Sequence, residues 1–110
     1  MISAYKFPEI VLVEFPYVDM HQYKIRPALV LLQSSHQDLV LLRITSNTKI
    51  GENDSLIEEF QLAGLNQPSK IQIDKISTIE KVRIKGTIGH LSEKDKEQFI
   101  NNFKKVYSFL

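Results

Sequence analysis

Cysteine is absent from this chain of 110 residues, which excludes disulfide bonds, thiolate metal clusters and a thiol nucleophile. No apolar run approaches the roughly 18 residues that a membrane-spanning helix needs, and the N-terminal segment MISAYKFPEI lacks the apolar core of a signal peptide. The sequence holds no glycine-rich phosphate loop and no G-x-S-x-G nucleophile elbow. We therefore expect a cytoplasmic protein without a cofactor, a metal site or a membrane partner.

Positive and negative side chains nearly balance in number, and the formal net charge is +1. The distribution is uneven, because residues 52–59 carry four acids and no base, whereas residues 70–85 carry five bases against two acids. Such asymmetry permits a basic surface of the kind that a polyanion needs, although many solvated faces share it. The length is that of one domain, so we expect a single domain over residues 1–110.

Short aliphatic and β-branched runs, separated by turn-rich segments, predict a mainly β protein. The segment 17–26 is a polar connection, and 56–65 is ambiguous between a strand and a short helix, with a strand favoured. A slip in the alternation near Asp74 and Lys75 indicates a bulge or a bend. The expected strands are 9–16, 27–32, 39–45, 56–65, 70–79 and 82–91, the last interrupted by Gly86 and Gly89.

Residues 92–110 have the pattern of an amphipathic helix. Ser92 is a candidate N-cap, and Glu93 and Asp95 in the first turn favour the helix dipole. The apolar side chains recur at helical spacing, and they are Phe99, Ile100, Phe103, Val106, Tyr107 and Leu110. We interpret this stripe as core, and a share in a dimer contact is compatible with that role. Short strands followed by one helix predict a small, strongly bent antiparallel β-barrel with a C-terminal helix packed across it.

One hairpin places two polar residues together. If residues 34–37 close an antiparallel hairpin in which Gln33 faces Asp38, Arg26 falls opposite Thr45. Facing residues point to the same side of a sheet, with Cβ atoms about 4.5–5.5 Å apart. A guanidinium and a hydroxyl would then meet at the open end of the hairpin.

Four motifs, in order from residue 9 to residue 92, resemble those of the MazF/PemK toxins of bacterial toxin–antitoxin pairs: EIVLVEFPYVD, KIRPALVLL, RITS and IQIDKISTIEK…IGHLS. The resemblance implies an SH3-like barrel with a C-terminal helix, usually a homodimer. It implies metal-independent, sequence-selective cleavage of single-stranded RNA, which stops translation and growth. It also implies inhibition by a cognate antitoxin whose acidic, flexible tail occupies the RNA site.

The same resemblance assigns the site. The family's catalytic arginine, which precedes Pro-Ala, matches Arg26, and its hydroxyl residue matches Thr45, with Ser46 beside it. The chain departs from the family pattern at Pro8-Glu9, usually Gly-Asp, and at His21-Gln22 in the first long loop, where the family usually has small residues. Because that loop helps to hold RNA in the family, His21 and Gln22 are candidate RNA contacts.

The residue types fit this chemistry. Attack of the ribose 2′-hydroxyl on phosphorus builds charge on the phosphorane oxygens, and the planar fork of Arg26 binds such oxygens bidentately. Thr45 would donate a hydrogen bond to a phosphate oxygen. Lys24 and Lys75 are candidate phosphate contacts, which position RNA without reading its sequence. Aromatic residues in the same region could stack on bases, and these are Tyr17 and Tyr23.

Four alternatives stay open. A histidine acid–base pair would serve a metal-free ribonuclease, but His21 has no partner at a suitable spacing in the sequence, and His36 and His90 lie in a turn and near a glycine. Asp19-x-His21 and His36-x-Asp38 could ligate a metal, but two-ligand spacings this short are common by chance. The chain could also be a CcdB-like toxin that binds DNA gyrase, against which the absence of tryptophan counts, or a relative that binds RNA or a partner without catalysis.

Overall fold

A computed structural model describes residues 4–16 and 23–109. In this part of the chain six strands form one antiparallel sheet, in the order β4-β5-β3-β2-β1-β6. The elements are β1 (Glu9–Pro16), β2 (Tyr23–Gln33), β3 (Asp38–Thr45), β4 (Asp54–Ile57), β5 (Ser69–Glu80), the 3₁₀ turn η1 (Lys81–Arg83), β6 (Ile84–His90) and α1 (Glu93–Val106).

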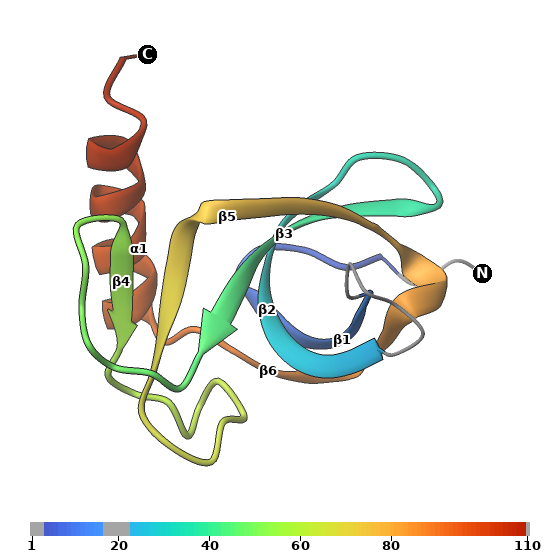
Figure 1. The fold of residues 1–110 in the computed structure, drawn as a ribbon, viewed down its shortest axis with the longest axis horizontal. Coiled ribbons are helices and arrows are strands. Elements are labelled where there is room, and N and C mark those ends of the chain that lie inside the picture. Colours follow the sequence, from blue (N-terminus) through green and yellow to red (C-terminus); the bar gives the residue numbers. More distant parts are fainter. Residues whose placement is uncertain (1–3, 17–22, 110) are drawn as a thin grey trace.

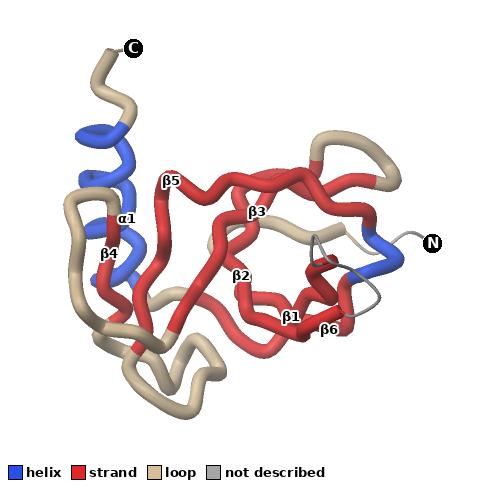
Figure 2. The backbone as a smooth tube through the Cα atoms, in the orientation of Figure 1, coloured by secondary structure: helices blue, strands red, loops and turns tan. Residues whose placement is uncertain are grey.

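The sheet is strongly bent, and its edge strands β4 and β6 do not pair with each other. Figure 1 shows β1, β2, β3, β5 and β6 curling around a common interior while α1 stands beside β4, outside the curl. Figure 2 shows the same separation between the strand-built part and the helix. This architecture confirms the prediction of a mainly β, barrel-like fold with a C-terminal helix. No helix in the described ranges is long and apolar enough to cross a lipid bilayer.

Two hydrophobic clusters follow from this arrangement. The first lies between the sheet and α1 and includes Leu29, Ile73 and Phe99, against which Phe103 and Tyr107 pack. The second lies inside the curl and consists of Val11, Val13, Phe15, Ala28, Val30, Leu39 and Leu41. Because alternate residues of a strand face opposite sides, β1, β2 and β3 each contribute to both clusters. Both faces of these three strands therefore carry buried side chains.

The start of β2 differs from the sequence prediction. Residues 23–26, expected in a polar connection, are part of the strand, and the ladder with β1 pairs Pro16 with Tyr23 and Val13 with Arg26. The apolar pattern failed here because side chains at the end of a bent sheet face solvent, so a strand needs no hydrophobic residue there. The prediction of a strand over 9–16 is confirmed.

The segment 56–65 is a strand only as far as Ile57. Directly after it, the buried carboxylate of Asp95 accepts the backbone N–H groups of Glu58 at 3.1 Å and of Glu59 at 2.8 Å. These donors are therefore used by α1 rather than by a neighbouring strand, and the chain turns. The predicted irregularity in β5 is confirmed, because four residues of β5 but only Arg43 of β3 lie between two successive pairs of their ladder, Leu42 with Ile76 and Ile44 with Ile71.

Helix α1 begins as the sequence predicts. The Ser92 side chain accepts the N–H of Asp95 at 3.1 Å, which satisfies one of the free donors of the first turn. At the other end, the Tyr107 hydroxyl donates to the carbonyl of Ile73 at 2.7 Å and ties the helix to β5. Burial raises the pKa of the Tyr107 phenol, and the negative charge of Asp74 raises it further.

Tyr107→Phe tests this tie. We expect the free energy of unfolding to fall by about 1 kcal/mol at pH 7, since one hydrogen bond is lost and the ring is kept. Because the pKa of Tyr107 is raised on folding, its contribution is complete below pH about 10 and is lost as pH rises through the higher folded value. Urea unfolding of both proteins at pH 7 and above pH 10 should show the difference shrinking at high pH. A difference that grows with pH would contradict this account.

Candidate active site

The register between β2 and β3 decides which residues meet at the open end of this hairpin. Next to the turn, Gln33 faces Leu39 rather than Asp38, so the predicted register is wrong there by one residue. An irregularity between Val30 and Leu32 absorbs the extra residue, and beyond it Ala28 faces Arg43, as predicted. The bulge lies on the turn side of the hairpin, which leaves the site end in the expected register.

Arg26 and Thr45 lie two residues beyond the last described pair of this ladder, and they line the same two cavities. The Arg26 side chain is exposed and donates to the carbonyl of its neighbour Ile25 at 3.3 Å. Among the described residues no carboxylate forms an ion pair with it. The Thr45 oxygen accepts the N–H of Asn47 at 3.3 Å, so its own hydroxyl proton stays available. The pair therefore offers a guanidinium and an O–H donor to the same ligand.

The larger cavity has a volume of about 500 Å³ and is mixed in character. Its apolar lining consists of Leu12, Ile25, Pro27, Ile44, Leu65 and Ile88. Its polar lining consists of Arg26, Thr45, Ser46, Asn66, Gln67 and Ser69, with Gly64 between them. In Figure 1 the loop that joins β4 to β5, which carries residues 64–67, lies beside the end of β3.

The smaller cavity, of about 180 Å³, adjoins the first, because Arg26, Ile44 and Thr45 line both. Its remaining lining residues are Arg43 and Gln72. The Arg43 guanidinium lies over the Phe15 ring, 5.1 Å from the centroid, and this packing holds it on the inner side of the sheet. Two guanidinium groups thus line a small cavity, an arrangement suited to an anion such as a phosphate.

A buried ion pair fixes the chain that leaves Thr45. Lys70 faces Thr45 in the β3–β5 ladder and is 7% exposed. Its ammonium group donates to the Asp54 carboxylate at 2.7 Å and to the carbonyl of Lys49. The same carboxylate accepts the N–H of Gly51 at 2.7 Å. Lys70 thus bonds the backbone of the loop 46–53 at Lys49, and Asp54 bonds it at Gly51. The segment that follows Thr45 is therefore restrained.

Close backbone packing fixes the other wall of the larger cavity. Residues 59–64 form a turn that ends at Gly64, with φ 79°, and the N–H of His90 donates to the carbonyl of Leu62. A Cβ on Gly64 would lie 2.0 Å from the carbonyl oxygen of Ile88, and one on Gly89 would lie 2.6 Å from that of Leu62. Two glycines therefore let the turn and β6 touch, and Asn66 and Gln67 follow directly.

The predicted site residues divide into three groups. Arg26, Thr45 and Ser46 are brought together at the larger cavity. Lys24, exposed on β2, and Lys75, exposed in the bulge of β5, line neither cavity. The remaining predictions fall on side chains outside the described part of the structure, and these are Tyr17, His21, Gln22 and Tyr23.

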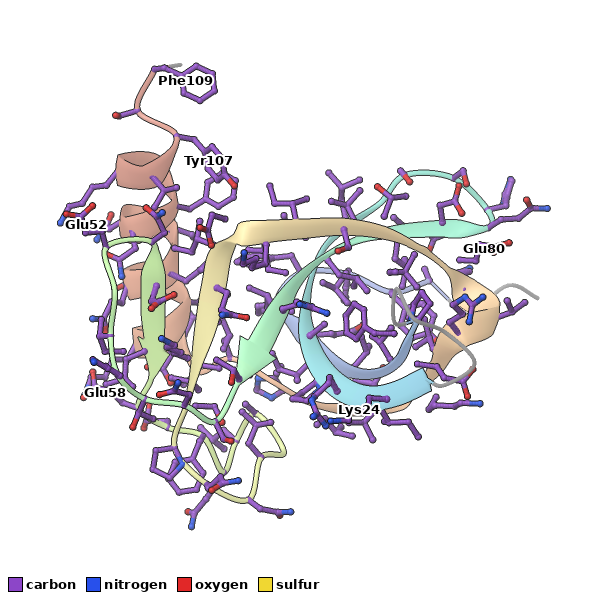
Figure 3. All side chains as sticks on the ribbon, viewed as in Figure 1. Lys24, Glu52, Glu58, Glu80, Tyr107 and Phe109 are labelled. Carbon is purple, nitrogen blue, oxygen red and sulfur yellow. The ribbon has the colours of Figure 1, made fainter. Side chains whose placement is uncertain are left out.

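The other candidates lie away from the cavities. His36 is in the turn after β2 and His90 is at the end of β6, and neither lines a cavity. In the described ranges no three histidine, aspartate or glutamate side chains gather as a possible metal site. Figure 3 shows Glu52 and Glu58 on the side of β4 and α1, and Lys24 on β2 on the other side of the molecule. The acidic run of the sequence is therefore separated from this lysine.

Sequence reasoning missed Arg43, Gln72, Asn66 and Gln67. Arg43 carried a usable signal, since it precedes Thr45 by two residues in a strand and so shares its face. The position of Asn66 and Gln67 depends on how the turn 59–64 packs on β6, for which the sequence has no periodic pattern.

Taken together, the fold is a small bent β-sheet whose strand ends carry two adjoining cavities lined by arginine and hydroxyl groups. A family model described as "PemK-like, MazF-like toxin of type II toxin-antitoxin system" matches residues 6–107. The chain belongs to this PemK/MazF toxin family, and the resemblance seen in the sequence is confirmed. A comparison with curated proteins finds no match.

Solved structures of the same fold are similar at low sequence identity. The Mycobacterium tuberculosis toxin MazF-mt6 is 20% identical, with a TM-score of 0.73 over 91% of this chain and 96% of that one. A MazE–MazF structure from Deinococcus radiodurans is 15% identical, with a TM-score of 0.75 over 98% and 99%. A mycobacterial endoribonuclease in complex with its cognate antitoxin is 12% identical, with a TM-score of 0.73 over 97% and 98%.

Removing one partner of the buried ion pair should be costly. We expect Lys70→Ala to lower the free energy of unfolding by about 3–5 kcal/mol, because the Asp54 carboxylate is left without its cation in a site where both side chains are about one-tenth exposed. Lys75→Ala, in the exposed bulge of the same strand, should stay within about 0.5 kcal/mol of wild type. Urea denaturation measures both. If both variants lose the same free energy of unfolding, the ion pair does not stabilise the fold.

Gly64→Ala tests the packing of the turn on β6. We expect a loss of about 2–5 kcal/mol, from a left-handed backbone of about 1–2 kcal/mol and an overpacked contact of about 1–3 kcal/mol. Gly86→Ala is the matched control, because φ is 148° there and a Cβ would meet nothing within 4 Å. Its loss should come from backbone strain alone, about 1–3 kcal/mol, because the substitution there causes no overpacking. If Gly64→Ala unfolds at the same urea concentration as wild type, the close approach is not needed.

Proposed function

We propose that this toxin is a metal-independent endoribonuclease that cleaves single-stranded RNA at short sequence motifs, leaving 2′,3′-cyclic phosphate and 5′-hydroxyl ends. The single observation that carries the proposal is that Arg26 and Thr45, from neighbouring strands, line both of two adjoining cavities. The description of a similar solved protein as an endoribonuclease is consistent with this proposal. Cleavage of mRNA by residues 1–110, acting as one toxin domain in the cytoplasm, would inhibit translation and growth.

The reaction requires the protein to stabilise developing negative charge and to position the phosphodiester. The 2′-hydroxyl oxygen attacks phosphorus and loses its proton, the P–O5′ bond breaks, and the leaving 5′ oxygen takes up a proton. Arg26 stabilises the charge that builds on the phosphorane oxygens through its planar, positively charged fork. Thr45 donates a hydrogen bond to a second phosphate oxygen and holds the group for in-line attack. A preorganised donor of this kind contributes about 2.7–4 kcal/mol.

RNA binding uses residues around this pair. Ser46 contacts the scissile phosphate or its neighbour, and the exposed Lys24 and Lys75 attract flanking phosphates without reading sequence. The loop residues Tyr17, His21 and Gln22 complete the contacts to RNA. His21 and Gln22 lie in the loop that helps to hold RNA in the family, and Tyr17 is an aromatic residue that can stack on a base.

We further propose that a cognate antitoxin with an acidic, flexible tail occupies the same site, and that the toxin is a homodimer. Antitoxin complexes exist for the similar structures from mycobacteria and Deinococcus radiodurans. In this chain two guanidinium groups, of Arg26 and Arg43, line the smaller cavity. Carboxylates pair with such groups in the same bidentate way as phosphates do, so an acidic tail competes directly with RNA.

Arg26→Ala is the decisive variant. In the presence of EDTA, wild-type protein should cut a long single-stranded RNA, and Arg26→Ala should cut it about 10²- to 10³-fold more slowly, since one charged donor to the transition state is gone. Lys105→Ala removes the same charge from the exposed face of α1 and should leave the rate unchanged. Mapping the cleaved ends identifies the 5′-hydroxyl product. Equal rates for wild type and Arg26→Ala would refute the assignment of the site, and growth arrest without any RNA cleavage would favour a gyrase-binding toxin.

A further inference from the structure

We infer that the larger cavity is a pocket for one unstacked base of single-stranded RNA, and that Asn66 and Gln67 read the edge of that base. This inference rests on the proposed function and deepens it, because it names two specificity-determining residues. It starts from the position of the cavity, which shares Arg26 and Thr45 with the smaller one. A phosphodiester held by this pair has a nucleoside on each side, and one of them would lie over the larger cavity.

Charge separates the two cavities. The smaller one has two guanidinium groups in a lining of five residues, whereas the larger one has Arg26 as its single charged residue in a lining of 13. The smaller cavity, which Arg43 lines, therefore offers a phosphate more positive charge than the larger one. The larger cavity suits a neutral group instead.

The apolar surface of the larger cavity suits a flat ring, for which the cavity has room. The volume of about 500 Å³ lies in the range of small-molecule sites, which are lined mainly by apolar groups with a few polar groups that fix orientation. Ile25, an apolar residue of the wall, is 50% exposed, and Leu12 and Leu65 add apolar surface. Contact between these side chains and water is unfavourable, and the face of a base placed on them would remove apolar surface from water.

The polar groups are of the kind that reads bases. In the described part of the chain, the side-chain amides of Asn66 and Gln67 are exposed and make no hydrogen bond. Each amide offers donors and an acceptor side by side, which matches the hydrogen-bonding edges of unstacked bases. A bidentate pair of this type discriminates about 5- to 150-fold against the wrong base.

Backbone geometry fixes the segment that carries the two amides. The turn 59–64 is fixed against β6 through Gly64 and Gly89, and the Ser69 hydroxyl donates to the carbonyl of Gln67 at 3.0 Å. A readout group must be positioned by a rigid scaffold to discriminate. The backbone at Asn66 and Gln67 is held in this way although both residues belong to a loop.

The test compares Asn66→Ala and Gln67→Ala with two matched controls. Asn101→Ala removes an exposed amide from α1, and Gln61→Ala removes one from the same turn, and neither control residue lines the cavity. Cleavage ends are mapped on a long RNA in EDTA. In at least one cavity variant we expect the base preference at one position next to the cut to relax by about 5- to 150-fold. Both controls should keep the wild-type motif.

A binding measurement keeps the inference independent of catalysis. Fluorescence anisotropy with labelled oligouridine, oligocytidine and oligoadenosine compares the affinities of wild type, the cavity variants and Arg26→Ala. Arg26→Ala should bind more weakly while keeping the wild-type order of bases, and the cavity variants should lose that order. If wild type cuts RNA and both cavity variants keep its motif, the base pocket is wrong and the nuclease stands. If wild type does not cut RNA, the proposed nuclease activity is wrong, and the order of base affinities alone tests the pocket. Loss of that order in the cavity variants supports the base pocket. The pocket is overturned if the cavity variants keep the order, or if wild type shows no order.

Discussion

The pairing register of β2 and β3 is the constraint on which the rest of this site depends. In a strand the side-chain period is two, so a slip of one residue would move Arg26 to the opposite face from Thr45. The hairpin does contain such a slip, but it lies between Val30 and Leu32, near the turn. At the other end Ala28 faces Arg43, and the same face continues to Arg26 and Thr45. The position of the bulge, rather than its presence, keeps Arg26 and Thr45 on one face of the hairpin.

Restraints on both sides of this hairpin convert a strand end into a site. On one side the Lys70–Asp54 ion pair, buried opposite Thr45, holds the loop 46–53. On the other, Asp95 captures the backbone of Glu58 and Glu59, and the following turn packs directly on β6. These links reach the site from α1, β4, β5 and β6. A site at the ends of strands has few hydrophobic contacts of its own, so its rigidity is supplied by hydrogen bonds and close backbone packing.

The division of charge gives the site its chemical character. Two guanidinium groups line the small cavity, whereas the lining of the large one is neutral apart from Arg26. An RNA strand has the same division, with charged phosphates and neutral bases in alternation. The acidic residues Glu52 and Glu58 lie on the side of β4 and α1, away from Lys24 (Figure 3). A protein with a net charge of +1 can in this way attract a polyanion to one region without a basic surface overall.

Local patterns in the sequence determined the strands 9–16 and 39–45, the irregularity in β5, the Ser92 cap and the amphipathic helix, because each depends on neighbours within a few residues. The four ordered motifs determined the family and with it Arg26 and Thr45 as candidates. Only the tertiary structure decided that β2 begins at Tyr23, that β4 stops at Ile57, and that Arg43, Asn66 and Gln67 join the site. The reason is physical: these outcomes depend on which distant group captures a backbone donor, as Asp95 does, and on where two backbones can touch, as at Gly64. Neither leaves a periodic trace along the chain.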